Sequence, residues 1–379
     1  MNVQTPNIAI GTMSFLEKSQ TFVADILTHA HRFNSHYICR YPSTECPITS
    51  YKGYSLGSSH RTSLASVEFL RLTSRHFGLE RYLKNNQINC MHANFLYFAA
   101  DIVDLAKRVG IPLIVTAHGY DATETVEHVC KTRSGRYMLS KTQAIAEYAN
   151  QLVVPSKFIA DCLLRRGYPA KKIQVIPCGV DTDQLVSKYP SSERTGVLYV
   201  GRLVEKKGVK FLLKAWQAYQ HLIPDHDLYI VGGGKLAPFV NQFANVPEHR
   251  THYLGPLDRA DVYKFMQRCK VFCLPSTQSS TGDNEGNPVA VMEAKSFGLP
   301  TVTFAQGPML EVIENDFNGL LATDRDANDL GLKLVELCTN RDLWRACSEN
   351  SRQDAVSNYG LRKYIDSLES IYFNAIASS

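Results

Sequence analysis

The stretch EGNPVAVMEAKSFGLPTVTF, residues 285–304, contains a tight corner, a short helix and a strand in quick succession. Asn287 is a common N-cap residue and Pro288 suits the first helical position, so the pattern predicts a helix over 288–297. Gly298 then ends the helix, because glycine readily takes the left-handed conformation that closes one. The strand PTVTF follows at once, which is the order of a sheet whose strands are joined by helices.

Two acids flank the start of this helix. Glu285 lies just outside it and Glu293 lies on its second turn. A helix start presents unpaired N–H groups and a partial positive charge, which suit a phosphate. The two carboxylates can then accept hydroxyl groups on either side of that phosphate, so the spacing favours a site for a sugar nucleotide. Two solvent-facing acids near a helix start are the simpler interpretation of the same pattern.

Alternating apolar runs and helical stretches extend over the whole chain and predict parallel sheets with crossover helices. In the first half we expect strands at NIAIGT, HYIC, INCMHA, PLIVTAH, QLVVPS and IQVIPCG, and helices over 19–33, 62–84, 97–109 and 157–166. In the second half we expect strands at GVLYVGR, DLYIVGGG, THYLG, VFCLPS and PTVTF, and helices over 208–221, 235–244, 258–267 and 288–297. The polar stretch DTDQLVSKYPSSERTG separates the two series. The predicted fold class is therefore α/β, with two doubly wound domains that divide near residue 187.

Composition is that of a globular protein, with 44% hydrophobic and 20% charged residues among 379. That length exceeds one ordinary domain and favours two. No apolar run approaches the ~20 residues that a membrane-spanning helix needs, and the N-terminus lacks the regions of a signal peptide, so we expect a cytoplasmic protein. The ten cysteines are scattered without the spacing of zinc ligands, so we expect free thiols and no metal site.

Positive charge is concentrated in the first half of the chain. Residues 1–186 hold 20 Lys and Arg against 14 Asp and Glu, whereas residues 187–379 hold 21 against 22. Excess positive charge commonly meets phosphate groups on lipids, nucleic acids or activated sugars, although an ordinary solvated surface accounts for it equally well. The hypothesis for location is a peripheral contact with the anionic inner face of the cytoplasmic membrane, and we expect no nucleic-acid partner.

Polar side chains lie where the expected strands stop, which is where sheets of this kind bind ligands. Arg202 ends the strand VLYVGR and Lys207 precedes the next helix, so two cations can face the oxygens of a diphosphate. A basic loop is more often only a loop. His118 follows the strand PLIVTAH with Asp121 three positions on, and its imidazole can either support the loop or line a reacting centre. His92 in MHANF has a similar position with weaker support.

Two further patterns are less specific. The triple glycine at 232–234 lets bare backbone approach an anion, but its spacing matches neither common glycine-rich phosphate-binding motif. We interpret it as a tight turn in which Gly233 makes a modest ligand contact. Asp181 and Asp183 form an Asp-x-Asp pair that can bind a divalent metal, but no third acid is clustered with them, so capping and turn roles are favoured.

Together these segments resemble the family 4 glycosyltransferases, which are retaining enzymes of the GT-B fold. The resemblance spans nearly the whole chain and rests on the E-x7-E pattern of Glu285 and Glu293, on VGRLVEKKGV, on VPSKFIADCLLRRGYPAKKIQVIPCGVDTDQL and on TAHGYD. The segments SQTFVADIL and TGDNEGNPVAVMEA are most similar to the subgroup that builds bacterial exopolysaccharides such as colanic acid and amylovoran.

The resemblance implies two Rossmann-like domains that face each other across a cleft. Residues 1–187 would form the acceptor-binding domain, and residues 188–357 would form the domain that binds a nucleotide-sugar donor. The last helix, 358–379, would pack back onto the first domain.

Carried over by motif, the resemblance implies a role for each polar group. Arg202 and Lys207 would bind the diphosphate of the donor. Glu293 would bind the ribose and Glu285 the transferred sugar, while His118 would face the reacting centre. The remaining donor-side candidates are Gly233, Gly286, Asn287 and Val289, and the acceptor-side candidates are Gly11, Ser19, Thr21, His92 and Asp121.

The implied activity is transfer of a hexose from a nucleotide-diphosphate sugar to a glycan or lipid-linked glycan in bacterial surface or exopolysaccharide synthesis. The anomeric configuration would be retained. No metal or other cofactor would be required, because Arg202 and Lys207 would offset the charge of the departing diphosphate. A UDP-sugar is favoured over a GDP-sugar only because UDP is commoner among such enzymes.

Two departures from the family pattern stand beside this resemblance. Many relatives have a Gly-Gly loop after the first strand, whereas this chain has only Gly11, so the residues from Ser19 to Thr21 are an alternative. Cys178 replaces the usual asparagine in IPCGVD. Two other functions stay open: a nucleotide-sugar 2-epimerase of the same fold, and a catalytically silent partner that binds a nucleotide sugar and supports another transferase.

Overall fold

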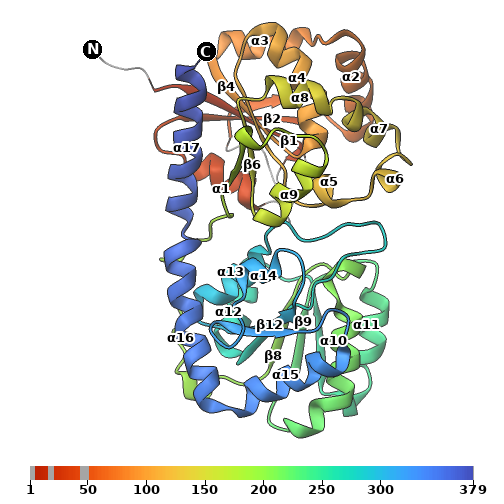
Figure 1. The fold of residues 1–379 in the computed structure, drawn as a ribbon, viewed down its shortest axis with the longest axis vertical. Helices are drawn as coiled ribbons and strands as arrows, with labels where there is room; N and C mark the ends of the chain where they lie inside the picture. The colour runs from red at the N-terminus through yellow and green to blue at the C-terminus, as the bar shows by residue number, and fades with distance from the viewer. Residues whose placement is uncertain (1–4, 16–20, 43–50, 379) are drawn as a thin grey trace. The chain divides into compact units, whose positions relative to one another are not determined.

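The computed structural model describes residues 5–15, 21–42 and 51–378, apart from the side chains of 21, 22 and 191. Contacts divide the chain into two compact units, Met1–Cys178 with Arg362–Ser379, and Gly179–Leu361 (Figure 1). The sequence pattern placed the division near residue 187, and the contacts place it after Cys178. Within the described ranges no helix is both long enough and apolar enough to cross a lipid bilayer.

The first unit contains a seven-stranded parallel sheet in the order β3-β2-β1-β4-β5-β6-β7. Its strands are β1 (Asn7–Phe15), β2 (Asn34–Pro42), β3 (Gly53–Ser55), β4 (Ile88–Asn94), β5 (Leu113–Thr116), β6 (Gln151–Val154) and β7 (Ile173–Val175). Its helices are α1 (Thr21–His29), α2 (His60–Thr73), α3 (Phe77–Asn85), α4 (Leu96–Val109), α5 (Tyr120–Thr123), α6 (Val126–Val129), α7 (Arg133–Ser140), α8 (Thr142–Tyr148), α9 (Lys157–Arg165), the 3-10 turn η2 (Ala170–Lys172) and α17 (Leu361–Ala377).

The second unit contains a six-stranded parallel sheet in the order β10-β9-β8-β11-β12-β13. Its strands are β8 (Val197–Val200), β9 (Leu228–Val231), β10 (Thr251–Gly255), β11 (Val271–Cys273), β12 (Thr301–Phe304) and β13 (Gly319–Ala322). Its helices are α10 (Val209–Tyr219), α11 (Ala237–Ala244), α12 (Arg259–Arg268), α13 (Val289–Ser296), α14 (Met309–Val312), α15 (Ala327–Thr339) and α16 (Arg341–Asn358), with 3-10 turns η3 (Ser191–Glu193), η4 (Glu205–Lys207), η5 (Gln220–Leu222) and η6 (Pro247–His249).

The central strands of both sheets are buried on both faces. All four residues of β5 and of β12 are buried, and β4 has one exposed residue among seven. Strands covered by helices on both faces form nearly continuous apolar runs. The predicted α/β class with two parallel sheets is therefore confirmed, and its strands were recognisable because each is such a run.

The last helix, α17, belongs to the first unit, and its ribbon lies beside that unit's sheet and helices (Figure 1). Buried polar groups bind it there. Glu369 is buried and accepts hydrogen bonds from the backbone N–H of His31 and of Arg32, at 2.7 and 2.8 Å, and from Arg32 Nε at 2.6 Å. Tyr372 Oη lies 2.7 Å from His92 Nδ1 on β4. A helix docked through buried hydrogen bonds in this way is fixed in register as well as in position.

Several elements differ from the prediction. The helix expected over 62–84 is two helices, because Ser74 takes the left-handed conformation (φ 56°) and ends α2. His76 then caps α3, its Nδ1 accepting from the N–H of Leu79 at 3.0 Å. The first helix ends at His29 rather than Phe33. The strand β3 and the short helices α5 to α8 were not predicted, because elements of three to eight residues show too little periodicity.

Candidate functional site

The loops that follow the strands of the second sheet bring together side chains from distant parts of the chain. Lys207 follows β8, and Glu285 lies in the loop that follows the neighbouring strand β11. Arg259 and Tyr263 lie in α12, which follows β10. Because all of these strands are parallel, their carboxyl ends lie at the same edge of the sheet, and polar groups gather there.

Gly208 allows the loop after β8 to lie directly against the loop after β11. Its φ is +67°, a left-handed conformation that links η4 to α10. A Cβ at this position would lie 1.8 Å from the carbonyl oxygen of Pro275. Thr277 N also donates to the carbonyl of Lys206 at 2.8 Å. The backbones of the two loops are therefore in direct contact, which sets how their side chains meet.

Lys206 holds the later part of the loop after β11. This lysine was not identified from the sequence. Its buried ammonium donates to Asp283 Oδ1 at 2.8 Å and lies 3.3 Å from the carbonyl of Asn284. Nothing in EKKG distinguishes Lys206 from the adjacent lysine. Their roles differ only because the 3-10 turn directs the two side chains to different partners.

Lys207, which is largely covered, forms an ion pair with the buried Glu285, with Nζ 2.9 Å from Oε1. Ser276 Oγ donates to the same carboxylate oxygen at 3.1 Å. Burial raises the pKa of Glu285, but the Lys207 and Lys206 cations outweigh it and hold that pKa below its ordinary value. Burial lowers the pKa of Lys207, and Glu285 opposes that shift. Each group therefore favours the charged form of the other, and burial opposes the charge of both.

Arg202 adds a second cation at this edge. Its side chain is exposed and, within the described ranges, makes no hydrogen bond or ion pair. Its charge contributes to the lowered pKa of Lys207, so the two cations lie close enough to interact. An exposed guanidinium near a fixed ammonium is suited to bind an anion with several oxygens.

Glu293 on α13 is held by two residues of α12 that the sequence did not single out. Arg259 Nη2 and Nε lie 2.9 and 3.1 Å from Glu293 Oε1. Tyr263 Oη donates to the same oxygen at 2.8 Å. Burial, and then the negative charge of Glu293, raise the pKa of Tyr263 far above its ordinary value, so the phenol stays protonated and remains a donor.

Glu285 and Glu293 are each held through a single carboxylate oxygen. In the part of the chain that the structure describes, every hydrogen bond to the side chains of Glu285 and Glu293 is received by Oε1. The second oxygen of each carboxylate, Oε2, is left to accept a hydrogen bond from a ligand. Two buried acids with one oxygen anchored and the other available are suited to bind hydroxyl groups.

The helix start between the two acids is arranged differently from the prediction. α13 begins at Val289, and Pro288 occupies the capping position without a side-chain hydrogen bond, so the prediction that Asn287 caps this helix is wrong. Gly286 is buried, whereas Asn287 and Val289 are partly exposed. Gly298 ends the helix in the left-handed conformation, as predicted.

The triple glycine at 232–234 allows close packing of the turn after β9 on the loop after β8. Gly232 has a φ of 137°, and a Cβ there would lie 2.0 Å from the carbonyl oxygen of Gly201. Gly233 accepts a hydrogen bond from Leu203 N at 2.7 Å. The turn after β9 thus supports the loop that carries Arg202.

In the first unit, His118 and Asp121 lie at the carboxyl end of β5. His118 Nε2 lies 2.9 Å from Asn94 Oδ1 on the neighbouring strand, and burial, with a smaller effect of His92, lowers the pKa of His118 to about 3. The imidazole is therefore neutral at neutral pH. Asp121 is buried and accepts from the N–H groups of His118 and Gly119, at 3.1 and 3.0 Å, so it supports the loop that presents the histidine.

The other first-unit candidates have packing positions or lie outside the described residues. His92 is buried between Tyr372 Oη and Thr116 Oγ1, the latter 2.6 Å from Nε2, and it therefore anchors α17. Gly11 lies within β1 and not in a loop after it, and a Cβ there would meet the ring of Phe98 at 2.2 Å. Ser19 and the side chain of Thr21 lie outside the described residues.

Across residues 5–15, 21–42 and 51–378, no group of three or more His, Cys, Asp or Glu side chains is placed to share a metal ion. Asp181 accepts from the N–H of Gln184 at 3.1 Å, which is a turn contact.

Two family models match consecutive parts of the chain. The model of glycosyltransferase family 4 matches residues 29–184, and that of glycosyl transferases group 1 matches residues 181–354. The second range contains every candidate residue of the second unit. The first contains His92, His118 and Asp121.

Known proteins resemble the chain over different lengths. The amylovoran biosynthesis glycosyltransferase AmsK of Erwinia amylovora is 31% identical over 193 residues, which are 50% of this chain and only 47% of AmsK. The UDP-Gal:alpha-D-GlcNAc-diphosphoundecaprenol alpha-1,3-galactosyltransferase of Escherichia coli is 23% identical over 92% of this chain and 90% of that enzyme. The crystal structure of HepE from Anabaena, in complex with UDP and glucose, has a TM-score of 0.75 at 15% identity, over 96% of this chain and 98% of HepE, which is a likeness of fold.

The contact at Gly208 yields a prediction with a closely matched control. Gly208→Ala and Gly255→Ala both place a side chain at a φ of +67°, with a left-handed cost of ~1–2 kcal/mol. Only the first also drives a Cβ into a carbonyl, because nothing lies within 4 Å of a Cβ at Gly255. Urea unfolding should therefore show a clearly larger loss of stability for Gly208→Ala. Equal losses would mean that the two loops do not lie in direct contact.

Proposed function

Because this chain belongs to the glycosyltransferases of the family 4 and group 1 type, with the two parallel-sheet domains of the GT-B fold, we propose that it transfers a hexose from a nucleotide-diphosphate sugar to a glycan acceptor. The acceptor is a glycan or a lipid-linked glycan in the synthesis of a bacterial surface or exopolysaccharide. The second unit, residues 179–361, binds the donor, and the first unit binds the acceptor.

The observation that carries this proposal is the ion pair of Lys207 and Glu285 beside the exposed Arg202. A diphosphate has several anionic oxygens and needs donors that are charged and already in place. Glu285 favours the charged form of Lys207, and Arg202 is exposed and can reach the phosphates. The Lys207 ammonium has three N–H donors, so it can keep its contact with Glu285 and still donate to a phosphate oxygen.

The two glutamates bind the sugar parts of the donor. Oε2 of Glu293 accepts from a ribose hydroxyl, and Oε2 of Glu285 accepts from a hydroxyl of the transferred hexose. The start of α13 between them contributes the backbone N–H of Val289, whereas Pro288 has none to contribute. Gly286, which is buried between the two acids, leaves room for the donor to approach the backbone.

The reaction retains the anomeric configuration and uses no metal. An acceptor hydroxyl attacks the anomeric carbon on the face from which the diphosphate departs, the bond from that carbon to the diphosphate oxygen breaks, and the acceptor proton passes to the departing phosphate. Arg202 and Lys207 stabilise the negative charge that develops on the diphosphate. His118, neutral at neutral pH, hydrogen-bonds the sugar at the reacting face.

UDP is the proposed nucleotide, with GDP as the competitor. Support comes from the Escherichia coli relative, whose name specifies UDP-galactose, and from the Anabaena neighbour crystallised with UDP. The same relative is named for a diphosphoundecaprenol acceptor, which supports a lipid-linked acceptor.

A donor panel tests this function directly. The purified chain is incubated with UDP-, GDP- and ADP-sugars, with and without EDTA, while thermal shift and released nucleotide are followed. We expect one UDP-sugar to stabilise the protein and to be hydrolysed slowly, without sensitivity to EDTA. Release of an isomerised nucleotide sugar would support an epimerase, and binding without any turnover, even with lipid-linked acceptors present, would support a silent partner.

Replacement of Lys207 separates its chemical role from its structural one. Lys207→Met should lower turnover roughly 10²- to 10³-fold, the usual effect of removing one donor to a developing anion. It also leaves Glu285 buried without its cation, so Lys207→Met with Glu285→Gln should recover stability without recovering turnover. Lys214→Ala, an exposed lysine on α10, is the control and should act as wild type. Near-normal turnover in Lys207→Met would remove the proposed role.

Tyr263 provides a test of the ribose contact. Tyr263→Phe removes one of the hydrogen bonds that orient Glu293, and we expect roughly tenfold weaker binding of UDP. Inorganic pyrophosphate and 2′,3′-dideoxy-UDP lack the ribose hydroxyls, so calorimetry should show little change in their affinities. Tyr189→Phe, at an exposed tyrosine, is the control. An equal loss for pyrophosphate would show that Tyr263 acts on the fold of the site and not on the ribose.

A further inference from the structure

Helices α2 and α3 expose an unusual set of apolar side chains. Leu64, Phe69 and Leu72 on α2 are 56, 45 and 77% exposed, and Phe77 at the start of α3 is 63% exposed. The rings of Phe69 and Phe77 are 6.3 Å apart, so the apolar surface of α2 continues onto the start of α3. We call this surface, formed by the exposed side chains of residues 60–85, the α2–α3 face. Large apolar side chains grouped on a surface usually mark an interaction site.

The same face is strongly basic. Arg61, Arg75, Arg81 and Lys84 are all exposed on it, and Arg75 lies over the ring of Phe77 at 5.8 Å from its centroid. Between residues 60 and 85 the sequence has only two acids, Glu68 and Glu80. An apolar surface with exposed cations around it is suited to an anionic, partly apolar partner.

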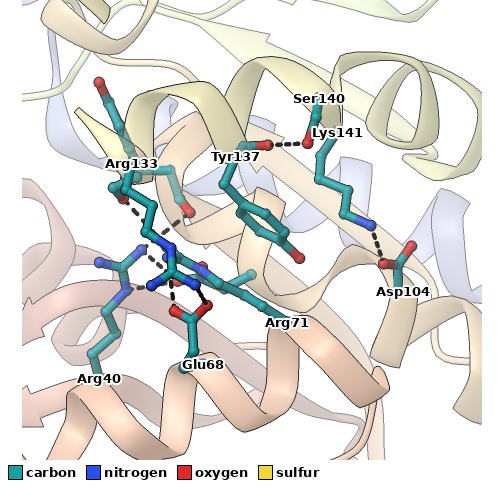
Figure 2. A network of polar contacts seen from close by, with 11 residues as sticks. Arg40, Glu68, Arg71, Asp104, Arg133, Tyr137, Ser140 and Lys141 are labelled. Carbon is teal, nitrogen blue, oxygen red and sulfur yellow. Dashed lines mark hydrogen bonds and ion pairs between the residues drawn. The ribbon is translucent and has the colours of Figure 1, made fainter. Parts of the chain in front are cut away.

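Both acids are neutralised by cations from elsewhere in the first unit. Glu68 is paired with Arg133 of α7, at 2.5 Å, and Arg71 lies 3.9 Å away (Figure 2). Glu80 pairs with Arg108 of α4. The α2–α3 face therefore presents positive charge without an unpaired carboxylate that would repel an anionic surface.

A polar network beneath the face makes it rigid. Arg71 donates from Nε to the buried Asp101 at 2.8 Å and lies over the ring of Tyr137, 4.5 Å from its centroid. Arg40 donates to the other oxygen of Asp101 at 2.6 Å. Figure 2 shows the side chains of Arg40, Arg71 and Arg133 gathered between α2 and α7. The outward side chains of α2 are thus held on a fixed platform.

We propose that the α2–α3 face docks on an anionic lipid bilayer. Leu72 and Phe77, the two most exposed apolar side chains, enter the interfacial region of the bilayer, while Arg61, Arg75, Arg81 and Lys84 contact the lipid phosphates. A bilayer accommodates this face better than a protein does, because four cations with no unpaired acid require a partner of uniform negative charge. The proposal does not depend on the donor chemistry proposed above.

A fluorescence experiment locates the contact. The two tryptophans, Trp216 and Trp344, are both buried in the second unit, 1 and 4% exposed. In Phe77→Trp a new, exposed tryptophan reports on the face. With vesicles of phosphatidylglycerol and phosphatidylethanolamine we expect a blue shift, and quenching when the lipids carry bromine on their acyl chains. Phosphatidylcholine vesicles should give neither effect. Flotation of the protein without a change in this tryptophan would overturn the proposed face.

Paired variants test the two components of the face by flotation. Arg61→Glu with Arg75→Glu should weaken binding to the anionic vesicles at least about thirtyfold, and added salt should weaken wild-type binding as well. Leu72→Ser with Phe77→Ser should also reduce it severalfold. The matched control is Leu332→Ser with Arg345→Glu, two exposed positions on α15 and α16, which should bind as wild type.

Two results would contradict the proposal. If the control variant lost binding to the same degree, the attraction would be a general charge effect. If wild type did not float but formed a dimer that Leu72→Ser with Phe77→Ser dissociated, the face would be a protein interface. Donor binding, measured by thermal shift, should be unchanged in all of these variants, so a failure here is separate from a failure of the proposed transferase function.

Discussion

The largely covered ion pair between Lys207 and Glu285 is the contact on which the proposed donor site depends. Burial disfavours each charge, and each is favoured by the opposite charge beside it. The pair also joins the loops after β8 and β11, whose backbones already meet at Gly208 and Pro275. In the proposed function, a diphosphate would meet a cation whose position is set before binding, so little reorganisation would be needed when negative charge develops.

Glu293 follows the same principle with different partners. Lysine anchors Glu285, whereas an arginine and a phenol anchor Glu293, and in both the anchored oxygen is Oε1. The helix that carries Glu293, α13, is also held by a buried lysine. Lys295 on α13 is fully buried, donates to the carbonyl of Val312 at 2.7 Å and pairs with Asp354 on α16. The positions of the two acids are therefore fixed in two ways. The loop that carries Glu285 packs on the loop after β8, and the helix that carries Glu293 is bound through Lys295 to Val312 and Asp354.

Much of the fold and part of the site could be predicted from the sequence. Strands buried on both faces leave continuous apolar runs, and Arg202, Lys207, Glu285 and Glu293 lie at or after such runs in recognisable spacing. Lys206, Arg259 and Tyr263 could not be predicted, because the contacts that define them arise from the sheet order β10-β9-β8-β11, which joins segments far apart in sequence. Likewise, histidine and glycine are common in binding sites, so His92 and Gly11 were candidates from the sequence. Only the packing shows that His92 anchors α17 and that Gly11 leaves room for the ring of Phe98.

Part of the excess positive charge in the first half of the chain lies on α2 and α3. Residues 60–85 carry five Lys and Arg against two acids, and both acids are paired. Ordinary solvated charge would not need Leu72 and Phe77 exposed beside it, since exposing them forfeits burial that a folded chain otherwise gains. A bilayer contact explains both features together. If the acceptor carries a lipid, as proposed, such docking would confine enzyme and acceptor to one surface and raise their effective concentration without a tighter acceptor site.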